Sequence, residues 1–222
     1  MLDHLRHIAI EGPIGVGKST LALRLATALN AHLLLERPDD NPYLERFYVD
    51  RERYAMQTQL AFLFQRIEQY RELAQPGMFG APRIVSDFMF AKDVLFARLT
   101  LSDDEYRLYA QIYAHMVPRL PQPDLVIWLQ ADAQTLLQRI ARRGIAMERS
   151  IDEAYVQGLS NAYAEYFDQA HATPLLAVDT SDFNPSTDDT DFVRLLERLA
   201  DFCGPREVFA PKAVHRRLKD SG

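Results

Sequence analysis

Gly12-Pro13-Ile14-Gly15-Val16-Gly17-Lys18-Ser19-Thr20 decides the fold, because this stretch fits the pattern G-x-x-x-x-G-K-[ST] and its flanks fit as well. The apolar run 7–10 leads into it, and residues 21–29 leave it with apolar side chains at helical spacing. Strand, glycine-rich turn and helix are the context in which this pattern forms a phosphate-binding loop. The alternative is an ordinary glycine-rich turn before a helix.

The chemistry of this loop predicts a site for a nucleoside triphosphate. Glycines let backbone N–H groups point inward without Cβ clashes, and the start of the following helix favours anions. We expect Lys18 to reach the outer phosphates and the hydroxyl of Ser19 to bind Mg²⁺. The residues predicted to bind the triphosphate cofactor are the whole loop, namely Gly12, Pro13, Ile14, Gly15, Val16, Gly17, Lys18, Ser19 and Thr20.

Composition narrows the class of protein. A chain of 222 residues, 48% hydrophobic and 25% charged, is typical of one globular domain. Its net charge of −6 argues against a dedicated nucleic-acid binder, and the single Cys203 excludes an internal disulfide framework. The N-terminus lacks the apolar core of a signal peptide, and no apolar run approaches the ~20 residues that span a bilayer. We therefore expect a cytoplasmic protein without nucleic-acid or membrane partners.

Strand and helix patterns alternate along the chain, which favours an α/β fold with a parallel sheet. Short strands are predicted at 7–10, 32–36, 82–87, 124–129 and 174–178. The expectation from these patterns is a five-stranded parallel sheet flanked by helices in three layers, with the phosphate loop after the first strand. Residues 1–203 form the predicted domain, and 204–222 are expected to be a flexible tail.

Two carboxylates stand at predicted strand ends, where parallel sheets bind their ligands. Glu36 ends the second strand and Asp87 the third. Phosphoryl transfer to a hydroxyl needs a proton acceptor and neutralisation of charge, and a carboxylate near Ser19 can hold Mg²⁺. Each acid could instead be a capping or solvated side chain.

Three arginines end the predicted helix 133–143, namely Arg139, Arg142 and Arg143. Basic residues at this position commonly interact with the carboxyl end of the helix dipole. They could instead belong to a lid that closes over the transferring phosphates. Arg139 and Arg143 are four residues apart and share a helix face, whereas Arg142 points partly elsewhere.

Several separated motifs follow one another in the order of a known family. They are Glu11–Thr20, Asn41-Pro42-Tyr43-Leu44 with Phe47-Tyr48, Ser86–Asp93 with Leu95-Phe96-Ala97, Arg139–Glu148, and Asp179-Thr180-Ser181-Asp182-Phe183. Between Ile8 and Phe183 the chain thereby resembles the deoxyribonucleoside kinases, in particular their bacterial deoxyadenosine/deoxyguanosine kinase branch. In that family Glu-Pro is usual, whereas Arg37 here separates Glu36 from Pro38.

The resemblance implies a role for each matching residue at the nucleoside end of the site. Glu36 is the general base that takes the proton from the deoxyribose 5′-hydroxyl, and the 3′-hydroxyl is bound by Tyr48 and Glu148. Gln59 reads the base edge, with Gln57 as the alternative for this role. The remaining residues around the base are the paired Arg66 and Asp93 and the apolar wall Phe96.

The resemblance also implies roles at the phosphate end. Arg139 and Arg143 match the arginines of the lid, and Asp87 helps to bind Mg²⁺. The arginine that usually follows this acid is absent, because Phe88 stands in its place, and Lys92 is the candidate for its contacts with phosphate and the general base. Asp182 and Phe183 belong to the loop that cups the donor adenine.

The fold that the resemblance implies is a three-layer P-loop kinase fold with an arginine-containing lid at about 139–150. The activity that it implies is ATP-dependent, Mg²⁺-assisted 5′-phosphorylation of a deoxyribonucleoside, with purines favoured, by a homodimer. A nucleoside monophosphate kinase of the thymidylate kinase type is the runner-up, but its phosphate acceptor needs basic residues where this chain has acids. A regulatory P-loop switch is the alternative from another class. No base-reading Asn-Lys-x-Asp signature supports that alternative.

Overall fold

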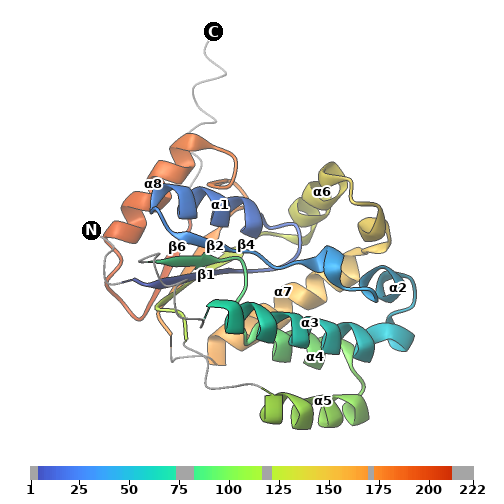
Figure 1. Cartoon of the computed structure of the whole chain (residues 1–222). Helices are drawn as coiled ribbons and strands as arrows, with labels where there is room; N and C mark the ends of the chain where they lie inside the picture. Colours follow the sequence, from blue (N-terminus) through green and yellow to red (C-terminus); the bar gives the residue numbers. More distant parts are fainter. Residues whose placement is uncertain (1–4, 74–82, 117–121, 170–172, 212–222) are drawn as a thin grey trace.

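The computed structural model describes residues 5–73, 83–116, 122–169 and 173–211. A parallel six-stranded sheet with the order β2-β3-β1-β4-β5-β6 forms its centre (Figure 1). Its strands are β1 (His7–Glu11), β2 (His32–Leu34), β3 (Ile84–Ser86), β4 (Leu125–Gln130), β5 (Leu175–Asp179) and β6 (Arg206–Phe209). The predicted α/β fold with a parallel sheet flanked by helices is confirmed.

Central position in the sheet explains the composition of β1 and β4. Every residue of β1 is buried, and so are the first five residues of β4. Ile8 pairs with Val85 of β3 on one side and with Leu125 of β4 on the other. Both faces of these strands are covered by helices, which is why they read as nearly continuous apolar runs.

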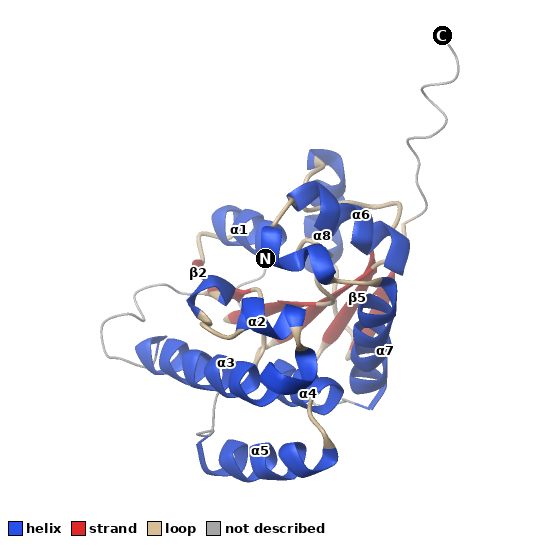
Figure 2. Ribbon diagram, turned by 90° about the vertical axis from the view of Figure 1, so that its right-hand side faces the viewer, coloured by secondary structure: helices blue, strands red, loops and turns tan. Residues whose placement is uncertain are grey.

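Helices cover both faces of the sheet (Figures 1 and 2). One face carries α1 (Lys18–Ala28) and α8 (Asp189–Ala200), and their apolar sides share a core with β1 and β4. The other face carries α4 (Lys92–Thr100) and α7 (Glu153–Gln169), with α3 (Arg51–Leu73) beside α4. The helix α5 (Asp103–Met116) packs outside α3 and α4. The short α2 (Leu44–Val49) lies against α3.

The sixth strand corrects the expectation of five strands and of a flexible tail that begins at residue 204. β6 pairs in parallel with β5, where Val178 lies opposite Phe209. The ion pairs Arg206–Asp168 and Arg198–Glu207 attach it to the end of α7 and to α8. Residues 212–222 of the expected tail lie outside the described part of the chain.

Parallel pairing brings functional segments to one edge of the sheet. The phosphate loop follows β1, while Glu36 and Asp87 follow β2 and β3. The lid helix α6 (Ala133–Arg143) begins at Asp132, whose side chain accepts a hydrogen bond from the backbone N–H of Thr135, and ends at Gly144. The described residues include no helix with both the length and the apolar character that a membrane span requires.

His7 makes stability depend on pH. Its Nε2 donates to Ser86 Oγ at 2.9 Å, and the Ser86 hydroxyl donates to the carbonyl of Phe88. Burial lowers the pKa of His7 to about 4, although the charge of Asp124 opposes this shift. Below about pH 6.5 the unfolded chain therefore binds a proton at His7 that the native state does not bind.

We predict that His7 removes up to ~3 kcal/mol of stability as the pH falls from about 6.5 to about 4. The free energy of unfolding in urea, measured at pH 7.0 and near pH 4.5 for the wild type and His7→Gln, tests this prediction. Carboxylates contribute equally to both proteins. The change in the free energy of unfolding between the two pH values therefore differs between wild type and His7→Gln only by the contribution of His7. Equal changes in the two proteins would contradict the prediction.

Candidate active site

Backbone conformation explains the glycines of the phosphate loop. Gly12, Gly15 and Gly17 have φ angles of 143°, 83° and 104°, which side chains rarely allow. A Cβ on Gly12 would lie 2.4 Å from the carbonyl oxygen of Leu129. A Cβ on Gly17 would lie 2.5 Å from Ser186 Oγ. The loop therefore packs against the end of β4 and the segment before α8 with no space for other residues.

Lys18 lies curled over the loop. Its Nζ donates to the carbonyls of Gly12 at 2.8 Å and Pro13 at 3.0 Å. Burial lowers the pKa of Lys18 to about 8, and the neighbouring charge of Lys92 adds to this effect while Glu11 opposes it. A phosphate group bound in the loop would offer this ammonium the negative partner that the two carbonyls only approximate.

Asp87 joins the phosphate loop to the second carboxylate of the site. Its Oδ2 accepts a hydrogen bond from Ser19 Oγ at 2.5 Å, and its Oδ1 accepts one from the backbone N–H of Glu36 at 2.7 Å. Burial raises the pKa of Asp87, which the bond from Ser19 opposes. A hydroxyl and a carboxylate oxygen in contact beside a phosphate loop are the donor set that Mg²⁺ prefers, so these residues fit the predicted ion.

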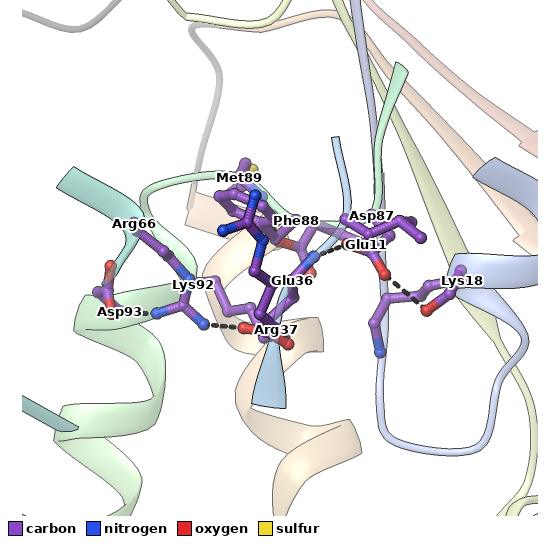
Figure 3. A network of polar contacts seen from close by, with 12 residues as sticks. Glu11, Lys18, Glu36, Arg37, Arg66, Asp87, Phe88, Met89, Lys92 and Asp93 are labelled. Carbon is purple, nitrogen blue, oxygen red and sulfur yellow. Dashed lines mark hydrogen bonds and ion pairs between the residues drawn. The ribbon is translucent and has the colours of Figure 1, made fainter. Parts of the chain in front are cut away.

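Glu36 is held by two cations from different helices (Figure 3). Arg66 of α3 donates to Oε1, and Lys92 of α4 donates to Oε2 at 2.8 Å. Burial by itself raises the pKa of Glu36, but the charges of Lys92 and Arg66 outweigh it and hold the pKa at about 2. Glu36 is therefore ionised throughout the physiological range and can accept a proton.

Arg66 also reaches a second acid (Figure 3). Its Nη1 donates to Asp93, which has no exposed surface, so that Arg66 bridges Asp93 and Glu36. Burial opposes the charged form of Arg66, but both carboxylates raise its pKa. The structure thus brings Arg66 and Asp93 together as predicted from the sequence, with Asp93 behind Arg66 and outside the cavity wall.

A cavity of about 490 Å³ opens between the phosphate loop, α2, α3, α4 and the lid. Gln59 lines it and donates to Thr100 Oγ1 at 3.1 Å, whereas Gln57 is exposed elsewhere on α3. The sequence left both glutamines open as base readers, and only Gln59 reaches the cavity. The other predicted residues in the wall include Glu36, Tyr48, Arg66, Asp87, Phe96, Arg139, Arg143, Glu148 and the loop from Ile14 to Thr20.

The lid arginines contact protein groups in this structure. The guanidinium of Arg139 donates to the backbone carbonyl of Thr180 at 2.6 Å and to the hydroxyl of Thr180 at 2.9 Å. Arg143 donates to both carboxylate oxygens of Glu148 at 2.6 Å. A lid arginine is therefore joined to the acid that the resemblance assigns to the sugar.

Asp182 and Phe183 do not line this cavity, and their place beside the donor adenine stays a prediction. Phe183 is 1% exposed and belongs to the core, where its ring meets Phe209 edge to face and lies under Arg194. Asp182 is exposed. The residues of this segment that line the cavity are Asn184, Ser186 and Thr187.

Sequence analysis assigned no role to several groups around the cavity. The fully buried Glu11 accepts hydrogen bonds from the backbone N–H of Met89 at 2.7 Å and the hydroxyl of Tyr163 at 2.8 Å. The sequence feature that could have identified Glu11 is a carboxylate directly before Gly12, at the end of an apolar strand. Glu11 does not line the cavity itself, whereas Thr58, Phe62, Ile145, Met147 and Tyr155 do, and no periodicity marked these five residues.

Together, a phosphate loop after the first strand of a parallel sheet and buried carboxylates at the neighbouring strand ends define a P-loop kinase. Comparison with known families makes this specific. The deoxynucleoside kinase family model matches residues 8–204, and the chain belongs to this family. It is thus an enzyme that phosphorylates deoxynucleosides at the expense of ATP.

Individual relatives agree with this membership and with its bacterial deoxyadenosine/deoxyguanosine kinase branch. Deoxyguanosine kinase of Bacillus subtilis is 35% identical over 84% of this chain and 88% of its own length. Deoxyadenosine/deoxycytidine kinase of the same organism is 32% identical over 87% of this chain and 91% of its own. Deoxyadenosine kinase from M. mycoides, solved with the products dCMP and a flexible dCDP, matches with a TM-score of 0.76 and 26% identity, over 88% of this chain and all of that one.

We predict that Gly12→Ala destabilises the protein by about 1–3 kcal/mol or more, because a positive φ and a clash with Leu129 coincide. Gly158→Ala on α7 is the matched control, since its Cβ would meet only Leu99 at 3.9 Å and helix propensity favours alanine. Urea unfolding of both variants measures the difference. Equal stabilities would contradict the assigned constraint.

Proposed function

We propose that the enzyme transfers the γ-phosphoryl group of ATP to the 5′-hydroxyl of a purine deoxynucleoside, deoxyadenosine or deoxyguanosine, for nucleotide salvage. The observation that carries this proposal is the contact of Asp87 with both Ser19 and the backbone of Glu36. One carboxylate thereby links the phosphate loop to an ionised acid in the same cavity. The names deoxyguanosine kinase in Bacillus subtilis and deoxyadenosine kinase in M. mycoides support a purine base. The second Bacillus subtilis relative is named for deoxycytidine as well as deoxyadenosine, and the M. mycoides structure holds dCMP.

Glu36 is the proposed general base. The low pKa of Glu36 makes this carboxylate a weak base in the free protein. The cations that lower the pKa, Lys92 and Arg66, are also groups that a phosphoryl group attracts. When negative charge arrives beside Lys92, the hold of this cation on Glu36 weakens. Glu36 then takes the proton of the 5′-hydroxyl as the oxygen attacks phosphorus.

The nucleoside is held by the remaining wall of the cavity. Tyr48 and Glu148 bind the 3′-hydroxyl and leave little room for a 2′-hydroxyl, which favours deoxyribose. Gln59 and Arg66, backed by Asp93, supply donors and acceptors to the edge of the base, and Phe96 forms an apolar wall. Buried polar groups of this kind discriminate strongly, because an analogue without the matching group leaves them unpaired.

Lys18 and the lid arginines neutralise the phosphates. Arg143 leaves Glu148 when the sugar engages that acid, and its guanidinium then faces the transferring group with Arg139. Ser19 and Asp87 would hold Mg²⁺, which supplies further neutralisation of phosphate charge when bound. The acids Glu36 and Glu148 disfavour a monophosphate acceptor, because a phosphate there would need cations.

We further propose that the protein is a homodimer of the cytoplasm, as its family resemblance implies. Sedimentation velocity of the purified chain and its position in fractionated cells test these two points. Neither outcome bears on the phosphoryl transfer itself.

Four deoxynucleosides, each supplied with ATP and Mg²⁺, test the function directly. We expect the purines to be phosphorylated fastest, and Glu36→Gln to lower turnover about 10²–10⁴-fold because it removes the general base. Nucleoside affinity, measured by titration calorimetry, should stay within about threefold, since glutamine is isosteric. Near-normal turnover of Glu36→Gln would remove the assigned base. Turnover of monophosphates alone would remove the proposed acceptor.

Loss of the Asp87 charge should raise the Mg²⁺ concentration that the enzyme requires for activity. Asp87→Asn keeps an oxygen beside Ser19 but removes the negative charge, so half-maximal activity should require about tenfold or more Mg²⁺. A titration of activity against Mg²⁺ at fixed ATP measures this. Asp201→Asn, exposed at the end of α8, is the matched control. An unchanged Mg²⁺ requirement would exclude Asp87 as a ligand or ligand partner.

A further inference from the structure

The four residues that follow Asp87 carry no positive charge, and the first cation after this acid is Lys92. Phe88, Met89 and Phe90 are buried and apolar, and the ring of Phe88 packs edge to face against Tyr70. A charged side chain at position 88 would be directed into this core. The acceptor side of the site must therefore obtain its positive charge from elsewhere.

Lys92 supplies a buried positive charge at that place. It stands in the first turn of α4, is 5% exposed and lines the cavity wall. Its Nζ donates to Glu36 and lies 5.3 Å from the centre of the Phe96 ring. An ammonium so removed from water requires a negative partner, and Glu36 is its one ion-pair partner among the described residues.

The two cations on Glu36 differ in their freedom to leave it. Arg66 is anchored on its far side by the fully buried Asp93 and is confined between α3 and α4. Lys92 has no second acid in direct contact within the described chain, and its flexible stem carries three donors, of which Glu36 takes one. Lys92 is thus the cation that can turn to a new anion while Arg66 keeps Glu36 in place.

Lys92 also lines the same cavity as Lys18 of the phosphate loop. Its charge is among the causes that lower the pKa of Lys18, and both lysines act on the buried Glu11. Two like charges held this near each other repel, and a doubly charged phosphate between them relieves the repulsion. The phosphoryl group passes between the loop that carries Lys18 and the acid that holds Lys92.

We propose that Lys92 binds the 5′-phosphate of the product, and the phosphoryl group on its way there, by moving its ammonium from Glu36 to the phosphate oxygens. This role rests on the proposed function. It makes Lys92 a residue that distinguishes the charged product from the neutral nucleoside. The cation that the acceptor side needs comes from α4, one helical turn beyond the strand-end acid.

Binding measurements without turnover test this role. Calorimetric titration with deoxyadenosine and dAMP, and with deoxyguanosine and dGMP, is carried out on the wild type and Lys92→Met. We expect Lys92→Met to weaken monophosphate binding at least about tenfold, the effect of losing one charge-assisted hydrogen bond, and nucleoside binding less than about threefold. Lys92→Arg should retain most of the monophosphate affinity.

Arg98→Met is the matched control, because Arg98 stands on the same helix α4, is exposed and is absent from the wall of the cavity. It removes the same charge at another place, and monophosphate affinity should stay within about threefold of the wild type. Lys92→Gln replaces Lys92→Met if thermal unfolding shows that the apolar variant does not fold.

Equal weakening of nucleoside and monophosphate binding by Lys92→Met, or an equal loss of monophosphate affinity in Arg98→Met, would overturn the proposal. A wild type that binds these ligands but phosphorylates none of the nucleosides would instead refute the proposed function. The two failures are therefore distinguishable.

Discussion

The structure depends on a balance of buried charges at the carboxyl edge of the sheet. Glu36 is held between Arg66 and Lys92, and Arg66 continues to Asp93. Taking such groups out of water costs several kcal/mol each unless they are paired, and an unpaired member would destabilise the fold. The strands β1 to β3 and the helices α3 and α4 must therefore meet in one arrangement, which also preorganises the site for phosphate.

Asp87 connects this balance to the phosphate loop. It has one oxygen on Ser19 and one on the backbone of Glu36, so donor and acceptor sides are fixed relative to each other by a single side chain. On the opposite wall, Arg143 occupies Glu148 and Arg139 occupies Thr180. Protein groups thus satisfy both arginines in this structure.

Local patterns predicted the parts of the fold that they encode directly. The loop motif with its strand and helix, the strand-end acids and the capped lid helix all follow from spacing within one segment. The edge strand β6 was missed, because it is short, alternates exposed and half-buried residues, and pairs on one side only. The burial of Phe183 in the core was not foreseen, since a motif counts residues but does not say which side chain turns into the core.

The sequence by itself determined the phosphate loop, the alternation of the first five strands with helices, the placement of Glu36 and Asp87 at strand ends, and the family. Only the tertiary structure decided that Lys92 reaches Glu36, that Gln59 rather than Gln57 faces the cavity, and that Arg143 lies on Glu148. The physical reason is the range of the interactions. Dihedral preferences and side-chain periodicity act within a segment, whereas pairing between buried charges depends on how distant helices pack against one sheet.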